Sequence, residues 1–187
     1  MKYDDTKVAG TLLFFGSVQF LLLLVIAEAL YPGYSVSKNY ISNLGIGPTA
    51  LIFNSSVFLL GVLAAASAYF VQRTFNFTFF SVFLTLTGIG AMGVGLLTEN
   101  AGDIIFIASL ITYVFGGLSA IVSYKLLKSP LSYFSVLLGA LSFVALVLFT
   151  SGIYLGLGVG GMQRVVAYPV LLWAVGFGGF LIGYSSK

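Results

Sequence analysis

The sequence predicts an all-α polytopic membrane protein, with six transmembrane helices in three antiparallel hairpins and both termini in the cytoplasm. Three observations lead to this prediction. The chain of 187 residues is 59% hydrophobic and only 7% charged, whereas about 25% of the residues in a soluble domain are charged. Six apolar runs approach the ~20 residues that cross a bilayer as a helix. Most of the basic residues fall in alternate connections, as the positive-inside rule requires.

The six runs form one predicted domain that covers residues 1–187. Each run is expected to be a helix, because an isolated strand would leave its backbone groups unpaired in hydrocarbon. Short connections make neighbouring helices antiparallel and adjacent. Only the connection 31–48 is long, and a loop of that length in a small membrane protein indicates a functional role. The predicted spans are residues 8–30, 49–71, 77–97, 104–127, 131–157 and 165–184.

The basic residues orient the predicted bundle. With the N-terminus inside, only Lys38 and Arg164 lie on the outer side. The cytoplasmic side then carries Lys2, Lys7, Arg73, Lys125, Lys128 and Lys187. Because cytoplasmic connections carry the excess of Lys and Arg, we expect a multi-pass protein of the cell (plasma) membrane with N- and C-termini in the cytoplasm.

Composition also limits the chemistry. The net charge of +3 is scattered along the chain, which argues against nucleic acid as a partner. The absence of cysteine excludes disulfides and thiolate metal sites, and the absence of histidine removes the commonest zinc and haem ligand. We expect no cofactor and no metal site, although quinone binding without a metal stays open. The nearly uncharged centres of the spans argue against a proton pump or an ion-coupled carrier.

Glu28 is the first candidate for a functional residue. It lies near the outer end of the first span, where a carboxylate is costly unless it is paired or close to water. Two cations are available on the same side, Lys38 and Arg164. Either Glu28 forms an ion pair that pins the long connection to the bundle, or it contacts a ligand or accepts a proton.

Two other connections bring polar groups to the same side. Glu99 and Asp103 flank the third connection, but two carboxylates are few for a calcium site, and Asp103 is expected to cap the fourth helix. The glycine-rich segment 158–164 is expected to join the fifth and sixth helices. Its Arg164 would lie at headgroup level, pair with an acid, or bind a carboxylate or phosphate ligand.

We expect these groups to frame a ligand site at the outer membrane face. The tyrosines of that side either form an interfacial belt or line a pocket for an amphipathic ligand, such as a lipid headgroup or a quinone. The predicted ligand-binding residues are Glu28, Tyr31, Tyr34, Lys38, Asn39, Asn43, Glu99, Asn100, Gln163, Arg164 and Tyr168. None of these residues is assigned a catalytic role.

Small residues spaced by four are expected to bring helices together, either inside the bundle or at a dimer face. These sets are Gly152, Gly156 and Gly160, then Gly179 and Gly183, and Gly116 with Ala120.

Several segments resemble a known family. EALYPGYS (28–35) and NYISNLG (39–45) resemble the first signature of a six-span family of archaeal and bacterial membrane proteins, the domain-of-unknown-function family nine-nine-eight. GPTALIFN (47–54), GVGLLTEN (93–100) and GGMQRVVAYP (160–169) are similar to its other signatures. Archaeal members often carry Glu at the position of Gln163, and this departure weakens any acid–base role there. The chain also distantly resembles eukaryotic DRAM-like proteins. The resemblance implies six helices and no established activity.

The sequence therefore predicts an integral membrane protein of unknown activity, most simply a non-catalytic ligand-binding or scaffold protein. Membrane lipid is the expected partner, with a larger membrane complex or a homo-oligomer also open. One alternative is an outer-leaflet lipid-modifying enzyme with Glu28 or Glu99 as base, which requires a water-accessible carboxylate facing a cleft. The other is a small-solute transporter, which requires a continuous polar path between the helices.

Overall fold

The computed structural model describes residues 4–97 and 101–184 of the chain. In these ranges the protein is all-α, and six helices are long and apolar enough to cross a membrane. They are α1 (Asp5–Leu30), α2 (Ala50–Phe75), α3 (Thr78–Leu96), α4 (Asp103–Val122), α5 (Leu131–Thr150) and α6 (Gly158–Gly183). The prediction of an all-α protein with six membrane-spanning helices is confirmed at this level.

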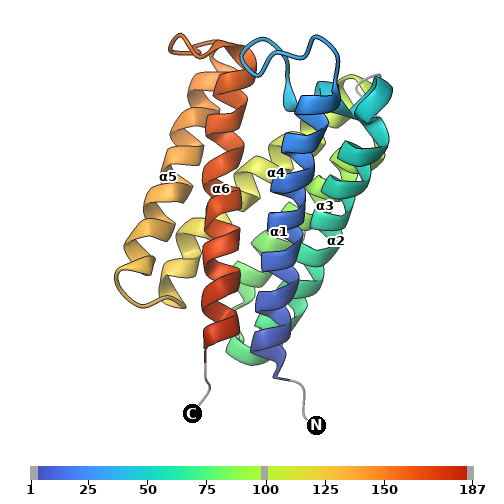
Figure 1. Ribbon diagram of the computed structural model, residues 1–187. Helices are drawn as coiled ribbons and strands as arrows, with labels where there is room; N and C mark the ends of the chain where they lie inside the picture. The colour runs from blue at the N-terminus through green and yellow to red at the C-terminus, as the bar shows by residue number, and fades with distance from the viewer. Residues whose placement is uncertain (1–3, 98–100, 185–187) are drawn as a thin grey trace.

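The helices stand side by side in an upright bundle (Figure 1). Each packs along its neighbours in sequence, and α1 also packs along α6. The start of α1 and the end of α6 lie at one end of the bundle, here called the terminal end. The connections α1–α2 and α5–α6 lie at the opposite end, here called the loop end. Helix α5 stands at the edge, and its main helix contacts are with α4 and α6.

The first helix begins and ends on clear local signals. The carboxylate of Asp4 accepts a 3.0 Å hydrogen bond from the backbone N–H of Thr6, which caps the helix start. At the other end Tyr31 is already extended, and Gly33 adopts a φ of +72°. The chain therefore leaves α1 in a Pro-Gly turn and enters the long connection.

The predicted boundary between the fifth and sixth spans is wrong. Helix α5 ends at Thr150 rather than at residue 157, and α6 begins at Gly158 rather than at residue 165. In the turn between them Gly152, Leu155 and Gly156 have φ angles of 73°, 49° and 79°. Such left-handed backbone interrupts a helix, but the apolar residues around it keep the hydropathy high. The segment 158–164, predicted as a link, forms the first turns of α6.

Other span limits shift by smaller amounts. Helix α2 continues past the predicted residue 71 to Phe75, where Asn76 adopts a left-handed conformation and closes the helix. The predicted fourth span, 104–127, is helical only to Val122 and then tightens into the short 3₁₀ helix η4 (Ser123–Lys125). The structure also makes Gly102 the N-cap residue of α4, so Asp103 stands inside the first turn instead of capping it.

Glycines allow the closest helix contacts. A Cβ atom on Gly10 of α1 would lie 2.6 Å from the carbonyl oxygen of Gly178 on α6. A Cβ atom on Gly61 of α2 would lie 2.5 Å from the carbonyl oxygen of Gly88 on α3. Both distances are below van der Waals contact, so a larger residue would push the helices apart.

The glycine sets expected from the sequence are only partly in contact. A Cβ on Gly116 of α4 would lie 2.8 Å from Val170 of α6, and Ala120 is fully buried. In contrast, Gly152 and Gly156 lie in the turn before α6 and face open space. Gly183 also has open space around it. Spacing by four alone does not reveal which side of a helix meets a neighbour.

An aromatic cluster fills the bundle toward the terminal end. The rings of Trp173 and Phe177 on α6 stack at 5.5 Å, and both rings contact Phe80 of α3. The indole N–H of Trp173 donates a 2.9 Å hydrogen bond to the hydroxyl of Ser123. Trp173 is 3% exposed, so its position inside the bundle is fixed.

Candidate functional site

The connection between α1 and α2 folds over the N-terminus of α6 (Figure 1). Its second half forms two short 3₁₀ helices, η1 (Ile41–Gly45) and η2 (Gly47–Thr49). In its first half, the carbonyl of Ser37 accepts a 2.9 Å hydrogen bond from the N–H of Gly160. The Ser37 hydroxyl donates to the carbonyl of Leu157 at 2.7 Å. Because α6 has no side-chain N-cap, the connection supplies an acceptor that a helix N-terminus otherwise lacks.

A glycine makes this contact possible. A Cβ atom on Gly160 would lie 2.5 Å from the carbonyl oxygen of Val36 and closer still to that of Asn39. Both obstacles are backbone atoms, so neither moves aside without displacing the connection. The glycine at this position is therefore required by the close approach of the connection to α6.

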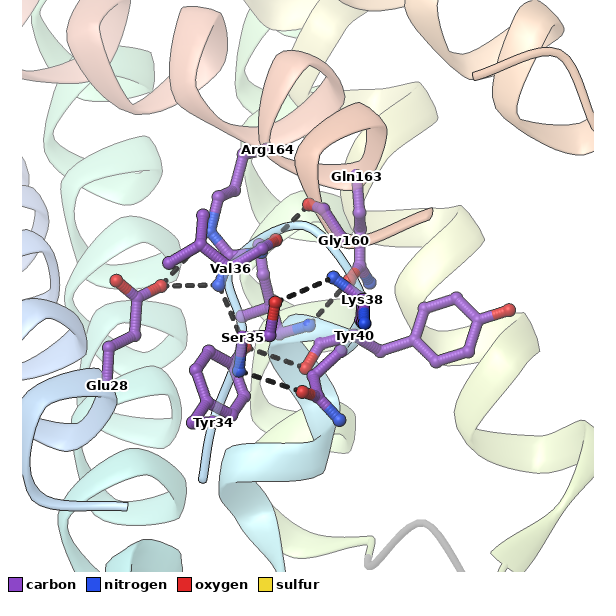
Figure 2. A network of polar contacts seen from close by, with 11 residues as sticks. Glu28, Tyr34, Ser35, Val36, Lys38, Tyr40, Gly160, Gln163 and Arg164 are labelled. Carbon is purple, nitrogen blue, oxygen red and sulfur yellow. Dashed lines mark hydrogen bonds and ion pairs between the residues drawn. The ribbon is translucent and has the colours of Figure 1, made fainter. Parts of the chain in front are cut away.

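Arg164 joins three parts of the chain at the loop end (Figure 2). Its Nε and Nη2 atoms donate to the same carboxylate oxygen of Glu28, at 3.1 and 2.5 Å. Nη2 also donates to the hydroxyl of Tyr34 at 2.8 Å. Nη1 donates to the carbonyls of Val36 and Gly160, at 2.9 and 2.8 Å. These bonds use all five N–H donors of a guanidinium group.

The ion pair is almost withdrawn from solvent, because the side chains of Arg164 and Glu28 are only 6% and 15% exposed. The expectation that Glu28 pairs with a cation and pins the long connection is confirmed, and the partner is Arg164. Lys38, the other cation considered, is exposed, and the structure gives it no ion pair within residues 4–97 and 101–184. Every guanidinium N–H of Arg164 already has an acceptor inside the protein.

Tyr34 completes this arrangement from the long connection. Burial raises its pKa above the usual value of 10.0, although its hydrogen bond with Arg164 acts in the opposite direction. The hydroxyl is therefore neutral at ordinary pH, and it donates to the carbonyl of Tyr40 at 2.9 Å. The ring of Tyr31 lies 5.8 Å from the ring of Tyr34. Together the two tyrosines hold the Pro-Gly turn against the ion pair.

The other predicted site residues have mainly local contacts. Asn39 accepts a 2.9 Å hydrogen bond from the N–H of Ser35 and so shapes the turn. The backbone N–H of Asn43 bonds to the carbonyl of Tyr40. Tyr168 packs, partly buried, against the apolar cluster beneath the connection. Glu99 and Asn100 lie outside the described residues, so their predicted place in the site stays a prediction.

Gln163 precedes Arg164 and engages different partners. Its Oε1 atom accepts a 2.6 Å hydrogen bond from the backbone N–H of Ile41 in η1. Its Nε2 atom donates to the hydroxyl of Tyr113 on α4 at 3.3 Å. The residue is 6% exposed. Gln163 therefore ties the connection, α4 and α6 together.

Beside Gln163 the bundle is hollow. A narrow cavity of about 90 Å³ runs between α1, α2, α3, α4 and α6. Ile41 and Gln163 lie at one end of it, and Ala64 and Trp173 lie toward the other. A second space of about 250 Å³ lies between α4 and α5 at the loop end and is lined in part by the exposed residue Phe106. The two spaces share four lining residues: Ser42, Ser109, Tyr113 and Gln163.

These two spaces are called the inner cavity and the lateral groove, and the four shared residues are called the neck. No residue that lines either space carries a charge. The polar atoms available are hydroxyls and the amide of Gln163, and most of the remaining wall is apolar. An uncharged, mostly apolar hollow with a few polar groups is typical of a site for a small hydrophobic ligand.

A family model described as "Protein of unknown function (DUF998)" matches residues 14–179. The chain belongs to this family. No curated protein and no solved structure matches the chain. The match covers Glu28, the neck and Arg164. The family description assigns no activity to these residues, and the six long apolar helices identify a multi-pass membrane protein.

Sequence reasoning missed most of the neck. Of its residues only Gln163 was among the predicted site residues, while Ser42, Ser109 and Tyr113 were not. A signal was present, because Ser109 and Tyr113 are four residues apart in an apolar run and therefore share one face of a helix. Within the described residues no group of three or more metal-ligating side chains comes together.

Proposed function

We propose that this protein is a non-catalytic membrane protein that binds a lipid or another small amphipathic ligand at the loop end of its bundle. The single observation that supports this best is the inner cavity, which shares the four wall residues of the neck with the lateral groove. Their uncharged lining suits an apolar ligand with a polar end. Membrane lipid supplies such molecules along the flank of α4 and α5.

The proposal places the loop end at the outer face of the cell membrane and both termini in the cytoplasm. Described basic residues favour this orientation, since Arg73 pairs with Asp5 near the start of α1 at the terminal end. Lys7, Lys125 and Lys128 belong to the connections or helix ends of that same side, whereas Lys38 and Arg164 belong to the loop end. A cytoplasmic excess of Lys and Arg is the general rule. The helices would then form three antiparallel hairpins across the membrane.

Within this proposal the predicted site residues divide into three roles. Gln163 contacts the ligand at the neck. Glu28, Tyr34 and Arg164 hold the connection that covers the cavity, because their polar atoms are already engaged with one another. The outer residues Tyr31, Lys38, Asn39, Asn43 and Tyr168 would form the rim around this cover. A role for Glu28 as a base is not favoured, since its carboxylate is held by Arg164.

Mass spectrometry of the protein under native conditions tests the proposal. The wild type, purified in mild detergent, is expected to retain a lipid-sized species. Ala91→Leu fills the inner cavity from α3, and Ala167→Leu fills it from α6. Both variants should lose most of the bound species. Ala140→Leu is the matched control, because Ala140 is exposed on α5 and outside both spaces, so it should retain the ligand.

Two results would contradict the proposal. One is a wild-type protein that carries no ligand and takes up none from added lipid. The other is equal retention by all variants, which would place bound lipid on the outer surface of the bundle. Thermal unfolding of each variant ensures that a loss reflects a filled cavity and not a collapsed fold, because added methylenes in a packed interior destabilise by about 1–3 kcal/mol.

A further inference from the structure

We infer that the ligand is a neutral, single-chain lipid whose head group carries a hydrogen-bond-accepting oxygen, bound at the neck with its chain in the inner cavity. This inference rests on the proposed function and specifies its ligand class. It follows from three features of the site: unused hydroxyl donors, the absence of charge, and the elongated lining of the cavity. The lateral groove between α4 and α5 gives the direction from which the lipid enters.

Two hydroxyl groups at the neck have protons without an acceptor. The Tyr113 hydroxyl accepts from Gln163 at 3.3 Å, yet no described residue accepts its own proton. Many helical hydroxyls in the described residues bond back to a carbonyl one turn earlier, as Ser17 does to Leu13 and Thr112 to Ala108, both at 2.8 Å. Ser109 makes no such bond in the described part of the chain. Donors facing an apolar space are unfavourable without a partner, and an oxygen of the ligand would supply one.

The neck is suited to an uncharged head group. No Lys, Arg, Asp or Glu lines either the inner cavity or the lateral groove. The nearby guanidinium of Arg164 has all five donors engaged, including two on Glu28. An anionic head group moved into this space would lose its hydration without gaining a counter-charge, which is strongly unfavourable. A hydroxyl or carbonyl head group avoids that cost and accepts from Tyr113.

The residues that line the inner cavity extend along the bundle. Along α1 its lining runs from Leu24 to Leu13, a distance of about 16 Å at a rise of about 1.5 Å per residue. Its volume is about 90 Å³, less than the roughly 150 Å³ that holds one benzene, so a bound chain requires the lining side chains to move apart. The deep wall of the cavity includes Leu84 and Trp173. An extended aliphatic or isoprenoid chain fits this elongated lining better than a compact ring or a double-chain lipid.

Trp173, at the deep end of the inner cavity, is the only tryptophan of the chain. Its fluorescence therefore reports ligand binding at that end. A bromine atom near the end of a bound chain would quench Trp173 fluorescence. The probes are a long-chain alcohol brominated near its end and the phosphate monoester of the same brominated alcohol, each added to the protein in nanodiscs. We expect the alcohol to quench saturably and the phosphate ester to bind at least tenfold more weakly.

Variants at the neck test where the head group binds. Tyr113→Phe removes the unused donor and should weaken binding of the alcohol by about three- to tenfold, the effect of one neutral hydrogen bond. Ser109→Ala should act in the same direction. The matched control is Tyr133→Phe, because Tyr133 is 73% exposed on α5, and it should leave the affinity unchanged. Leu110→Phe narrows the lateral groove and should slow association.

The outcomes separate the inference from the proposed function. Quenching that Ala91→Leu abolishes, but that is equally strong for the alcohol and the phosphate ester, would overturn the neutral head group while leaving a ligand-binding protein. Affinity unchanged by both Tyr113→Phe and Ser109→Ala would overturn the binding of the head group at the neck. Quenching by neither probe, or quenching unaffected by Ala91→Leu, would contradict the inner cavity as a ligand site and with it the proposed function.

Discussion

Arg164 donates two hydrogen bonds to a single carboxylate oxygen of Glu28, although the two residues are 136 positions apart in the chain. This pair connects the end of α1 to the beginning of α6. The remaining donors of Arg164 reach Tyr34 and the carbonyl of Val36, so the long connection is fixed at the same point. The ion pair therefore fixes the position of the long connection between α1 and α2, which covers the inner cavity.

The first prediction concerns this ion pair. Arg164→Met or Glu28→Gln should lower the free energy of unfolding by about 3–5 kcal/mol, because each leaves a buried charged partner uncompensated. The double variant Glu28→Leu/Arg164→Leu should be less destabilised than the sum of the single variants. Thermal or denaturant unfolding in mild detergent measures these differences.

The control for that prediction is the other ion pair of the described chain, between Arg73 and Asp5 at 3.2 Å. The side chain of Arg73 is 53% exposed, and exposed pairs contribute about 0–1 kcal/mol. Asp5→Asn should therefore have a small effect. If Asp5→Asn and Glu28→Gln lowered the stability equally, burial would not explain the contribution of the Glu28–Arg164 pair to stability.

The second prediction concerns the contact between the connection and α6. Gly160→Ala should displace the connection, because a Cβ atom would meet the backbone oxygens of Val36 and Asn39. Limited proteolysis between α1 and α2 should become faster, and stability should fall. Gly176→Ala is the matched control on the same helix, since no atom lies within 4 Å of a Cβ placed there. That variant should be neutral or more stable by up to about 1 kcal/mol.

The third prediction concerns alkaline pH. Burial raises the pKa of Tyr34 above 10.0, so above that pH the unfolded chain loses this proton while the folded chain retains it. Proton loss then favours the unfolded state, and the stabilisation is lost as the pH rises through the folded pKa. Tyr34→Phe should flatten the fall in stability above about pH 10. Identical pH profiles for wild type and Tyr34→Phe would contradict a raised pKa of the half-buried Tyr34 hydroxyl.

The fourth prediction concerns orientation in the membrane. The chain has no cysteine, so single cysteines can be introduced without removing native ones. Lys38→Cys, in the exposed connection at the loop end, should react with a membrane-impermeant thiol reagent from outside the cell. Lys128→Cys, exposed at the terminal end, should react only after the membrane is permeabilised. Reaction of both from the same side would reject the proposed topology.

Much of the fold was predictable from hydropathy, because long apolar runs have few alternatives to helices in a membrane. The ion pair was predictable too, since Glu28 had few cations on its side of the bundle. The start of α6 was not predictable, because left-handed backbone at Leu155 and Gly156 leaves no mark on hydropathy. Because of that error the sequence prediction placed Arg164 in a loop. In the structure Arg164 lies on α6.

The residues of the neck could not be predicted from the sequence for a different reason. A serine or threonine in a membrane helix commonly satisfies its hydroxyl on the same helix, as Thr112 does with Ala108. Only packing reveals that Ser109 and Tyr113 line the same two spaces as Gln163. Polar groups that distinguish a ligand site from an ordinary helix interface are recognised by their missing partners, and partners are a property of the folded chain.

Photocrosslinking in the membrane tests the central claim most directly. A long-chain alcohol with a photoreactive diazirine at the end of its chain is incorporated with the protein, and the labelled residues are mapped by peptide mass spectrometry. The account predicts labelling of residues deep in the inner cavity, such as Leu13, Leu84 and Trp173, and loss of that labelling in Ala91→Leu. Labelling confined to exposed residues of the outer surface, such as Phe79 and Val144, would contradict it.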